Sequence, residues 1–484
     1  MINRKNIQHY KKHSELPFTR EQRDRTTVLF GGLTLNHEHL IKGVMESLGY
    51  NADHLPVPDN QALQTGKEYG NRGQCNPTYY TVGNLIRYLN NLKMSGVSDI
   101  EDRFVFLTAG ACGPCRFGMY ESEYRKSLLE AGFRNFRILT FEQSDKFEKG
   151  VQNGLQANRA FYKALIKALV LGDILNEIGY RIRPYEKNAG ETDEVIALYR
   201  NSFYNAFLDN TSITATLRGL HKRLVRIEVD YLRVKPIVQI IGEFWAQTTE
   251  GDGSYRLARW LESEGAEVKT EPVSTWIDYL LWSSSLEEKD RFMIKPVIAA
   301  GRLMGIFMLK KLFNFYFNTY RRAVGRWTSS LPSQKRLADY ASPYFNVRIT
   351  GGEGHLEVGK HILAFKEKKA HMVVSVKPFG CMPSTLSDGV QSKVTSDLAE
   401  SIFVSIETSG DAEVNVKSRV QMKLYEARQR ANEEFNKALQ EHGIDYNRLK
   451  ERDKHGSLSN PMITLPHLYT GTAANFAVHA SRGK

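Results

Sequence analysis

The chain has 484 residues, of which 41% are hydrophobic and 25% are charged, and its formal net charge is +12. This length allows two or three domains with a large buried core, and the composition is ordinary for a soluble globular protein. Only four cysteines occur. That number argues against a secreted disulfide scaffold and for a reducing, cytoplasmic location.

Membranes and nucleic acids are poor partners for this sequence. The first twenty residues are basic but lack the apolar stretch of a secretory signal, and no segment has the ~18 uncharged apolar residues of a membrane span. The nearest candidate, 297–320, is interrupted by three basic residues, and we interpret it as a core helix rather than one lying on a membrane surface. Basic and acidic residues are interleaved, so the positive charge suits an acidic partner or substrate better than nucleic acid.

Strand and helix patterns alternate in two series, which predicts an α/β fold with mostly parallel sheets and helices on both faces. Long helical patterns cover 155–178 and continue to about residue 231. Apolar residues at steps of three and four predict an amphipathic helix from Val416 to Ala438. We expect the tail beyond about residue 460 to be loose or bound to a partner. The expected strands are 26–30, 103–107, 136–141, 234–241, 267–270, 371–376 and 401–406.

These patterns predict four parts of the chain. The expected units are an N-terminal extension (1–25), a first α/β domain (26–215), a second α/β domain (216–408), and a C-terminal helix with its tail (409–484).

The four cysteines all fall in loops that contain glycine or proline. Cys112 and Cys115 form a CxxC directly after an expected strand, Cys75 precedes Pro77, and Cys381 follows the strand at 371–376. Because loops at the carboxyl ends of parallel strands gather at one edge, we expect these thiols to converge. Such a set favours an iron–sulfur cluster, although a four-thiolate zinc site and a redox disulfide stay open.

At these residues the chain resembles the 2-hydroxyacyl-CoA dehydratase family, in its uncharacterised branch associated with activator ATPases. The resemblance runs from about Val28 to Ala427 and implies two flavodoxin-like domains with a 4Fe–4S cluster between them. Cys75, Cys112, Cys115 and Cys381 match the positions that this branch would use as ligands. The most specific blocks are GKEYGNRGQCNPTYYTVGN, FLTAGACGPCRFGMY and VKPFGCMPS, supported by HEHLIKGVMESLGY, GDILNEIGYRIRPYE, IGEFWAQTTEGDG and GGEGHLEVGK.

The family also implies partners. In members of known chemistry, a small ATPase with its own cluster passes one electron to the dehydratase component, and the electron goes on to a coenzyme A thioester. The sequence has no P-loop, so ATP hydrolysis would belong to that activator. We expect an oligomer that acts on an acyl-CoA-like substrate, as a dehydratase or reductase component.

One departure from the family affects the expected chemistry. Dehydratase subunits typically use three cysteines and leave one iron open, whereas four thiolates could close every iron site. A closed cluster would make the chain an electron relay or scaffold subunit rather than an enzyme.

Other polar clusters have plainer interpretations beside functional ones. His37-Glu38-His39 lacks the i,i+4 spacing of a helical metal site, so a polar helix start is favoured. Gly351–His355 is expected to be a glycine-rich turn, with Glu353 or His355 as the less favoured acid or base. Arg116 could bind a cluster sulfide or pair with Glu121 or Glu123. A polar pocket wall or a helix cap is expected at Glu243, Thr248, Glu250 and Asp252.

Overall fold

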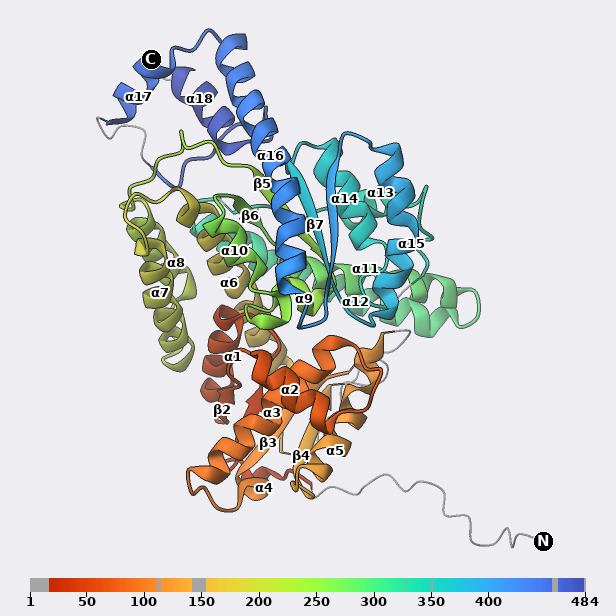
Figure 1. The fold of residues 1–484 in the computed structure, drawn as a ribbon. Helices are drawn as coiled ribbons and strands as arrows, with labels where there is room; N and C mark the ends of the chain where they lie inside the picture. The colour runs from red at the N-terminus through yellow and green to blue at the C-terminus, as the bar shows by residue number, and fades with distance from the viewer. Residues whose placement is uncertain are drawn as a thin grey trace, which may run out of the picture.

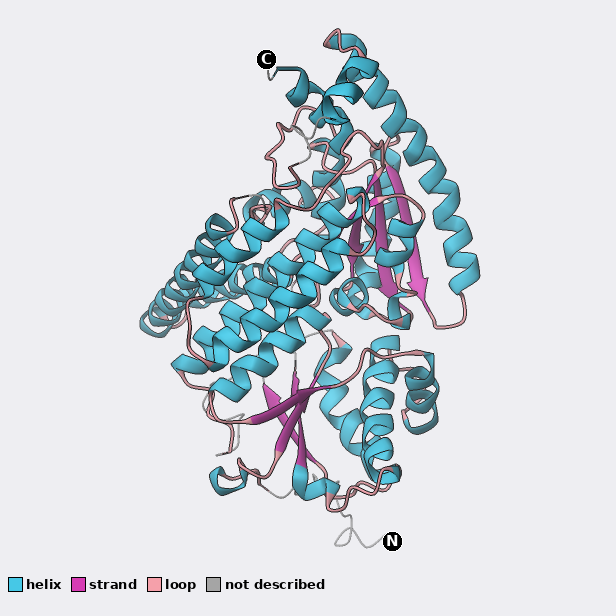
Figure 2. Ribbon diagram, turned by 90° about the vertical axis from the view of Figure 1, so that its left-hand side faces the viewer, coloured by secondary structure: helices cyan, strands magenta, loops and turns pink. Residues whose placement is uncertain are grey.

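Two parallel sheets with the same strand order form the framework of the protein. The computed structural model describes residues 17–110, 115–141, 154–326, 328–349, 351–454 and 460–482. Each sheet has four strands, ordered β2-β1-β3-β4 and β6-β5-β7-β8, and every pairing is parallel. The predicted α/β class with two flavodoxin-like units is therefore confirmed. Figures 1 and 2 show the sheets one above the other, each flanked by helices.

The first sheet lies between two helical layers. Buried side chains of α3 and α5 pack on one face, and those of α1 and α6 pack on the other. A short 3-10 helix, η2, precedes the sheet at Arg20–Gln22. The strands are β1 (Thr27–Phe30), β2 (Asn51–His54), β3 (Phe104–Ala109) and β4 (Arg137–Phe141). The helices are α1 (Leu35–Ser47), α2 (Asn60–Tyr69), α3 (Asn76–Met94), α4 (Ile100–Arg103), η3 (Arg116–Met119) and α5 (Tyr120–Glu130).

Three helices connect the two sheets and form the largest apolar cluster with parts of α12, α16 and α18. They are α6 (Arg159–Ile182), α7 (Glu191–Leu208) and α8 (Ile213–Leu224), with η4 (Arg183–Tyr185) after α6. The boundary expected at residue 215 lies within α8, and the division into domains stays a prediction.

The second sheet is covered by α10 and α16 on one face and by α14 on the other. Its central strand β7 is buried along its whole length, as expected for a strand with helices on both faces. The strands are β5 (Ile237–Gly242), β6 (Glu267–Lys269), β7 (Met372–Pro378) and β8 (Ile402–Thr408). The helices are α9 (Phe244–Thr248), η5 (Asp252–Ser254), α10 (Leu257–Ser263), α11 (Val273–Phe292), α12 (Pro296–Ala323), α13 (Gln334–Ala341), α14 (Leu356–Lys366) and α15 (Met382–Asp397).

The C-terminal part is more ordered than expected. Helix α16 (Glu413–Glu441) buries the stripe predicted from Val416 to Ala438. The expectation of a loose or partner-bound tail is wrong for α18 (Thr472–Arg482), because Phe476 and Val478 are fully buried within the largest apolar cluster. Helix α17 (Tyr446–Lys454) lies between them.

Helix α12 only partly matches the expected core helix. Phe313 and Phe317 are buried, but Val297 and Met304 in its first half remain 84% and 62% exposed. No helix in the described ranges combines the length and apolar character that crossing a bilayer requires.

Candidate functional site

Each cysteine in the described part of the chain stands at the start of a helix. Cys75 caps α3, Cys115 caps η3 and Cys381 caps α15. Cys115 and Cys381 follow the third strands, β3 and β7, of the two sheets. In this strand order the carboxyl ends of the first and third strands flank the switch point, where parallel sheets usually bind ligands. Cys112, the other CxxC cysteine, lies outside the described residues.

The loops of Cys75 and Cys381 touch across the junction of the two sheets. The backbone N–H of Asn76 donates to the carbonyl of Phe379 at 3.1 Å, and its side-chain amide donates to the carbonyl of Thr408 at 2.7 Å. Gly380, which lies between Phe379 and Cys381, has a φ of +76°, and a Cβ added to it would lie 3.6 Å from the Cα of Cys75. Glycine suits this position because it accepts the left-handed backbone conformation at little cost.

The loop that carries Cys75 is also bound to the segment that carries Cys115. Arg116 donates to the carbonyl of Gly73. Glu123 on α5 accepts from the side-chain amides of Asn71 at 2.8 Å and Gln74 at 3.2 Å. The structure therefore gives Arg116 a positioning contact in the Cys75 loop, and these bonds bring three distant cysteine segments to one place.

Cys75 and Cys381 are buried and Cys115 is half-buried, and carboxylates act on Cys115 and Cys381. The sulfur of Cys75 lies 3.1 Å from the Tyr120 hydroxyl and 3.3 Å from the Thr78 hydroxyl. Burial raises the pKa of Cys115 to about 12, assisted by the charges of Glu353, Glu243 and Cys75. Burial and the same two carboxylates also raise the pKa of Cys381. Without a bound cation Cys115 and Cys381 stay protonated at neutral pH, because their surroundings disfavour a thiolate.

A pair of carboxyl groups lies beside the thiols. Glu243 caps α9 and accepts from the backbone N–H of Ala246 at 2.8 Å, while Glu353 accepts from the N–H of Phe244 at 2.7 Å. Burial raises the pKa of both groups, and the charge of Glu243 adds to the shift of Glu353. Two like charges in a buried site cannot both ionise freely, so the pair retains a proton near neutral pH.

The site is built from two half-sites with the same local plan. Cys75-Asn76-Pro77-Thr78 and Cys381-Met382-Pro383-Ser384 share the pattern Cys-x-Pro-Thr/Ser at a helix start. In the second half, the 351–355 turn precedes α14, and the chain then enters the third strand, β7. In the first half, the Cys75 loop precedes α3, and the chain then passes through α4 into the third strand, β3. Glu353 thus stands in the second half where Cys75 stands in the first. The Cys-x-Pro repeat, which is visible in the sequence, relates Cys75 to Cys381 by local pattern, whereas the order of the elements places Cys381 where Cys115 stands in the first half.

The His37-Glu38-His39 cluster is structural. The Nε2 of His37 lies 3.2 Å from Asp173, which also accepts from the first N–H groups of α11. Glu38 accepts from the N–H groups of Gly32 and Leu33 at 2.7 and 3.0 Å, and His39 packs against Tyr204. The three side chains serve different contacts, as a polar helix start would.

The residues that were expected to form a polar pocket wall or a helix cap make separate contacts and do not line one pocket wall together. Glu250 accepts from the N–H of Leu35 at 2.7 Å and Asp252 accepts from that of Asn60 at 2.9 Å, so both join the second half to helix starts of the first. Thr248 bonds back to the carbonyl of Phe244 within its own helix. His355 is fully buried against Tyr279 and Trp282. Of these candidates, Glu243 and Glu353 are the ones whose charge raises the pKa of Cys115 and Cys381.

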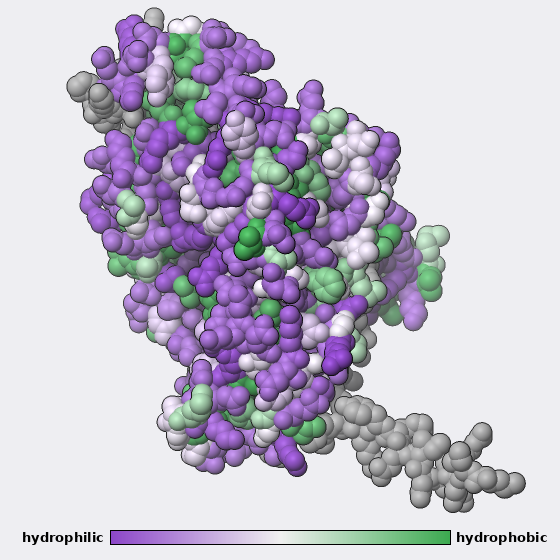
Figure 3. All heavy atoms as spheres, in the orientation of Figure 1, coloured by the Kyte–Doolittle hydropathy of each residue, from purple (hydrophilic) through white to green (hydrophobic). Residues whose placement is uncertain are grey.

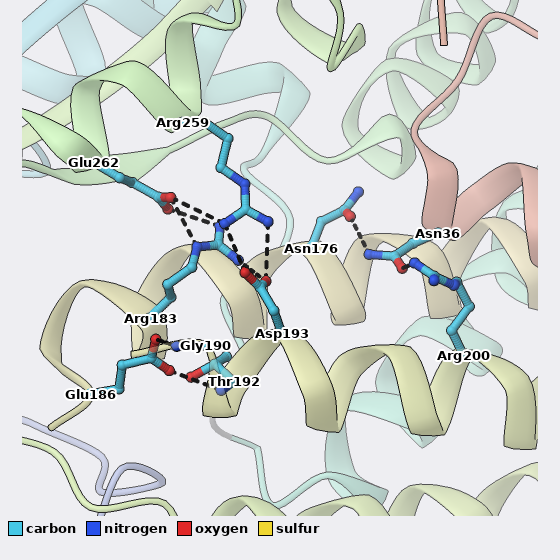
Figure 4. A network of polar contacts seen from close by, with 10 residues as sticks. All are labelled: Asn36, Asn176, Arg183, Glu186, Gly190, Thr192, Asp193, Arg200, Arg259 and Glu262. Carbon is cyan, nitrogen blue, oxygen red and sulfur yellow. Dashed lines mark hydrogen bonds and ion pairs between the residues drawn. The ribbon is translucent and has the colours of Figure 1, made fainter. Parts of the chain in front are cut away.

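Polar networks hold the helices between the two halves (Figure 4). Arg183 donates to both oxygens of Glu262 at 2.9 Å and to Asp193 at 2.7 Å, which fixes α6 and α7 against α10. Asn36 of α1 binds Asn176 of α6 and Arg200 of α7. The connecting helices are thus bonded to both sheet units, which fixes the half-sites relative to each other.

The assembled residues do not form a complete metal-binding group in the part of the chain that is described. Within it, no three His, Cys, Asp or Glu side chains lie close enough together to hold a metal ion. Cys75, Cys115 and Cys381 nevertheless provide the soft thiol donors that iron–sulfur clusters require. Comparison with protein families gave no match, and no curated protein is significantly similar to the chain.

Proposed function

We propose that the chain is an iron–sulfur protein in which Cys75, Cys112, Cys115 and Cys381 bind one 4Fe–4S cluster. It would accept low-potential electrons from an ATP-dependent activator that carries its own cluster. The electrons would drive reductive or radical chemistry on an acyl-CoA-like substrate, as the resemblance to 2-hydroxyacyl-CoA dehydratases implies. The observation that carries the proposal is the contact between Asn76 and Phe379, which places the Cys75 and Cys381 loops together.

The residues around the thiols suit a buried redox centre. A bound cluster supplies one-electron chemistry, and its reduction adds negative charge to the site. Tyr120 presents its hydroxyl to the sulfur of Cys75, and burial keeps water from both Cys75 and Cys381. Glu243 and Glu353 hold a proton near neutral pH, so they can donate it to a nearby basic atom.

A groove beside Cys381 offers room for the substrate. Its volume is about 620 Å³, and its walls include Thr385, Ser405 and Arg419. The side-chain nitrogen of Gln391 and the hydroxyl of Ser384 are buried there without a hydrogen-bond partner among the described residues. Unsatisfied polar atoms favour a polar ligand, and Arg419 adds positive charge for an anionic group.

The second candidate function is an electron relay with a closed cluster, which four thiolates would favour over an open iron. A Mössbauer comparison with and without candidate thioesters separates the two functions. An iron site that shifts when the thioester is added supports substrate activation, whereas an unchanged spectrum supports the relay.

Metal and sulfide analysis after anaerobic reconstitution tests the cluster itself. We expect about four irons and four sulfides per chain, and loss of iron in Cys75→Ser and Cys381→Ser. Met382→Ser is the matched control, since Met382 adjoins Cys381 in the same turn and is 48% exposed. Iron retained in both cysteine variants would disprove the shared site, and about one zinc without iron would indicate a four-thiolate zinc site.

A further inference from the structure

The hairpin of α11 and α12 projects from the body and carries an unusually apolar surface. We call its outer part, residues 284–315, the arm; Figure 1 shows it at the right, and Figure 3 shows hydrophobic spheres at the same edge. The exposed apolar side chains between residues 292 and 315 amount to roughly 1,000 Å², against the few hundred Å² usual for a patch on a monomer. A patch of this size indicates a binding surface.

The exposed residues of α12 form a stripe with the spacing of a helix–helix seam. The stripe steps by three and four residues and lies roughly 130° around the helix from the side buried on the body. Ala299, Phe313 and Phe317 belong to that buried side. The apolar stripe residues, exposed by 38–84%, are Val297, Met304, Met308, Leu312 and Phe315.

Two glycines interrupt this stripe on the solvent side. Gly301 and Gly305 are exposed, and a Cβ added at either would meet no atom within 4 Å. Each glycine costs a helix roughly 0.5–1 kcal/mol relative to alanine. Packing within this chain does not require them, whereas close approach of another helix would.

We propose that the stripe of α12 is the dimer interface of this protein, packed antiparallel against the same stripe of a second copy. A twofold axis between residues 304 and 305 would set Met304 opposite the partner's Gly305. It would also set Gly301 opposite the partner's Met308, and Val297 opposite the partner's Leu312. A methionine then faces a glycine in the first two pairs and two branched apolar residues face each other in the third, which gives the self-complementarity that an isologous interface needs.

Area and charge both favour a second copy as the occupant. The exposed apolar area of the whole arm is comparable to the ~800 Å² that each partner buries in a standard interface, and the five apolar side chains of the stripe supply about half of it. Helix α12 contains no acidic residue, but Arg302 lies 3.2 Å from Glu288 and Lys310 lies 2.8 Å from Asp278 of α11. These two cations are thus paired with carboxylates of α11, which reduces the repulsion between two arms and the pull toward an anionic membrane.

Sedimentation of the full chain at about 1–50 μM tests the proposal, with a circular dichroism spectrum for each variant. We expect a dimer of twice the 55.2 kDa chain mass. Gly301→Leu should weaken the dimer at least about tenfold, because the added side chain would occupy the space of the partner's Met308. Gly389→Leu is the matched control, since Gly389 is an exposed helical glycine of α15 with nothing within 4 Å.

Gly301→Leu also distinguishes a dimer interface, which depends on the match of large and small side chains, from a membrane-binding surface, which depends on apolar area alone. Gly301→Leu enlarges the apolar stripe, so it would strengthen binding to vesicles of phosphatidylcholine and phosphatidylserine if the stripe were a membrane surface. A native chain that is monomeric throughout, whether or not it binds these vesicles, overturns the proposal. So does a Gly301→Leu dimer as tight as the native one.

Cross-linking checks the orientation of the two helices. A short bis-maleimide should join two chains through Met304→Cys, close to the twofold axis, but not through Phe315→Cys, roughly 30 Å apart along the paired helices. The unsubstituted protein is the control for its native cysteines. Cross-linking at both positions would overturn the antiparallel arrangement.

Discussion

Asn76 and Phe379 are hydrogen-bonded at 3.1 Å although they belong to different sheet units and lie more than 300 positions apart. Each adjoins the turn that presents a cysteine, Cys75 in one case and Cys381 in the other. The geometry of the candidate site thus depends on how firmly the two sheet units are joined, and this bond lies closest to the cysteine turns among the bonds described above.

Gly380 gives the most direct test of that junction. Gly380→Ala should lower the free energy of unfolding by about 1–2 kcal/mol, because its φ of +76° disfavours a residue with a Cβ. Urea unfolding measures the change. Gly389→Ala in the neighbouring helix should instead stabilise the protein by up to about 1 kcal/mol. Equal stability of Gly380→Ala and the native chain would show that the junction tolerates the methyl.

Tyr120→Phe tests the surroundings of the thiols and rests on the proposed cluster. Its hydroxyl lies 3.1 Å from the sulfur of Cys75, and a hydrogen bond to a ligand sulfur raises the reduction potential of a cluster. The variant should keep its iron and show a lower potential in an EPR-monitored redox titration. Tyr124→Phe, which removes another buried hydroxyl from the same helix, should leave the potential unchanged. An unaltered potential in Tyr120→Phe would contradict the prediction.

Glu38 should make stability fall as the pH rises. Burial raises its pKa from 4.5 to about 8, so between these values the folded chain holds a proton that the unfolded chain releases. Stability from this group is full below pH 4.5 and is lost toward pH 8. Glu38→Gln should remove this slope and gain more than about 1 kcal/mol at pH 8 relative to pH 5.

Thermal unfolding at several pH values checks the Glu38 prediction. Glu130→Gln, at a side chain that is 50% exposed, is the control and should keep the slope of the native chain. Parallel curves for the native chain and Glu38→Gln would refute the assignment.

Arg183→Ala should lower the free energy of unfolding by about 3 kcal/mol. The substitution leaves the largely buried Glu262 without its bidentate partner, and this pair connects the helices between the sheets to the second sheet unit. Arg348→Ala removes an exposed pair with Asp290 and should cost less than about 1 kcal/mol. Denaturant unfolding compares the two variants. Similar losses would mean that the buried pair contributes no more than a surface one.

The sequence was most informative where apolar patterning is strong. Strands such as β7 and β8 lie within two residues of their expected ends, and α16 buries the predicted stripe. The strand β2 was missed because its residues, Asn-Ala-Asp-His, lack β-branched and aromatic side chains. Local pattern could not show that the first half of α12 leaves the body, since burial depends on which neighbours the fold provides.

The candidate site was only partly predictable. Turn residues around Cys75 and Cys381 indicated loops at a sheet edge, and the structure places these two loops in contact. The glycine-rich turn expected at Gly351–His355 is present before α14, but local pattern could not show that its Glu353 accepts from Phe244 beside Glu243, because the two segments lie more than 100 positions apart. The cluster, its ligand set and the electron donor stay predictions.

The spacing of the cysteines bears on how such a centre could be made in the cell. Residues 115 and 381 are 381 − 115 = 266 positions apart, which a ribosome covers in about 10–50 s. During that time the emerging chain already contains its first three thiols, while the loop that completes the pocket has not been synthesised. If the chain holds a cluster, complete loading would therefore have to wait until the segment around residue 381 has been synthesised and has folded against the first half.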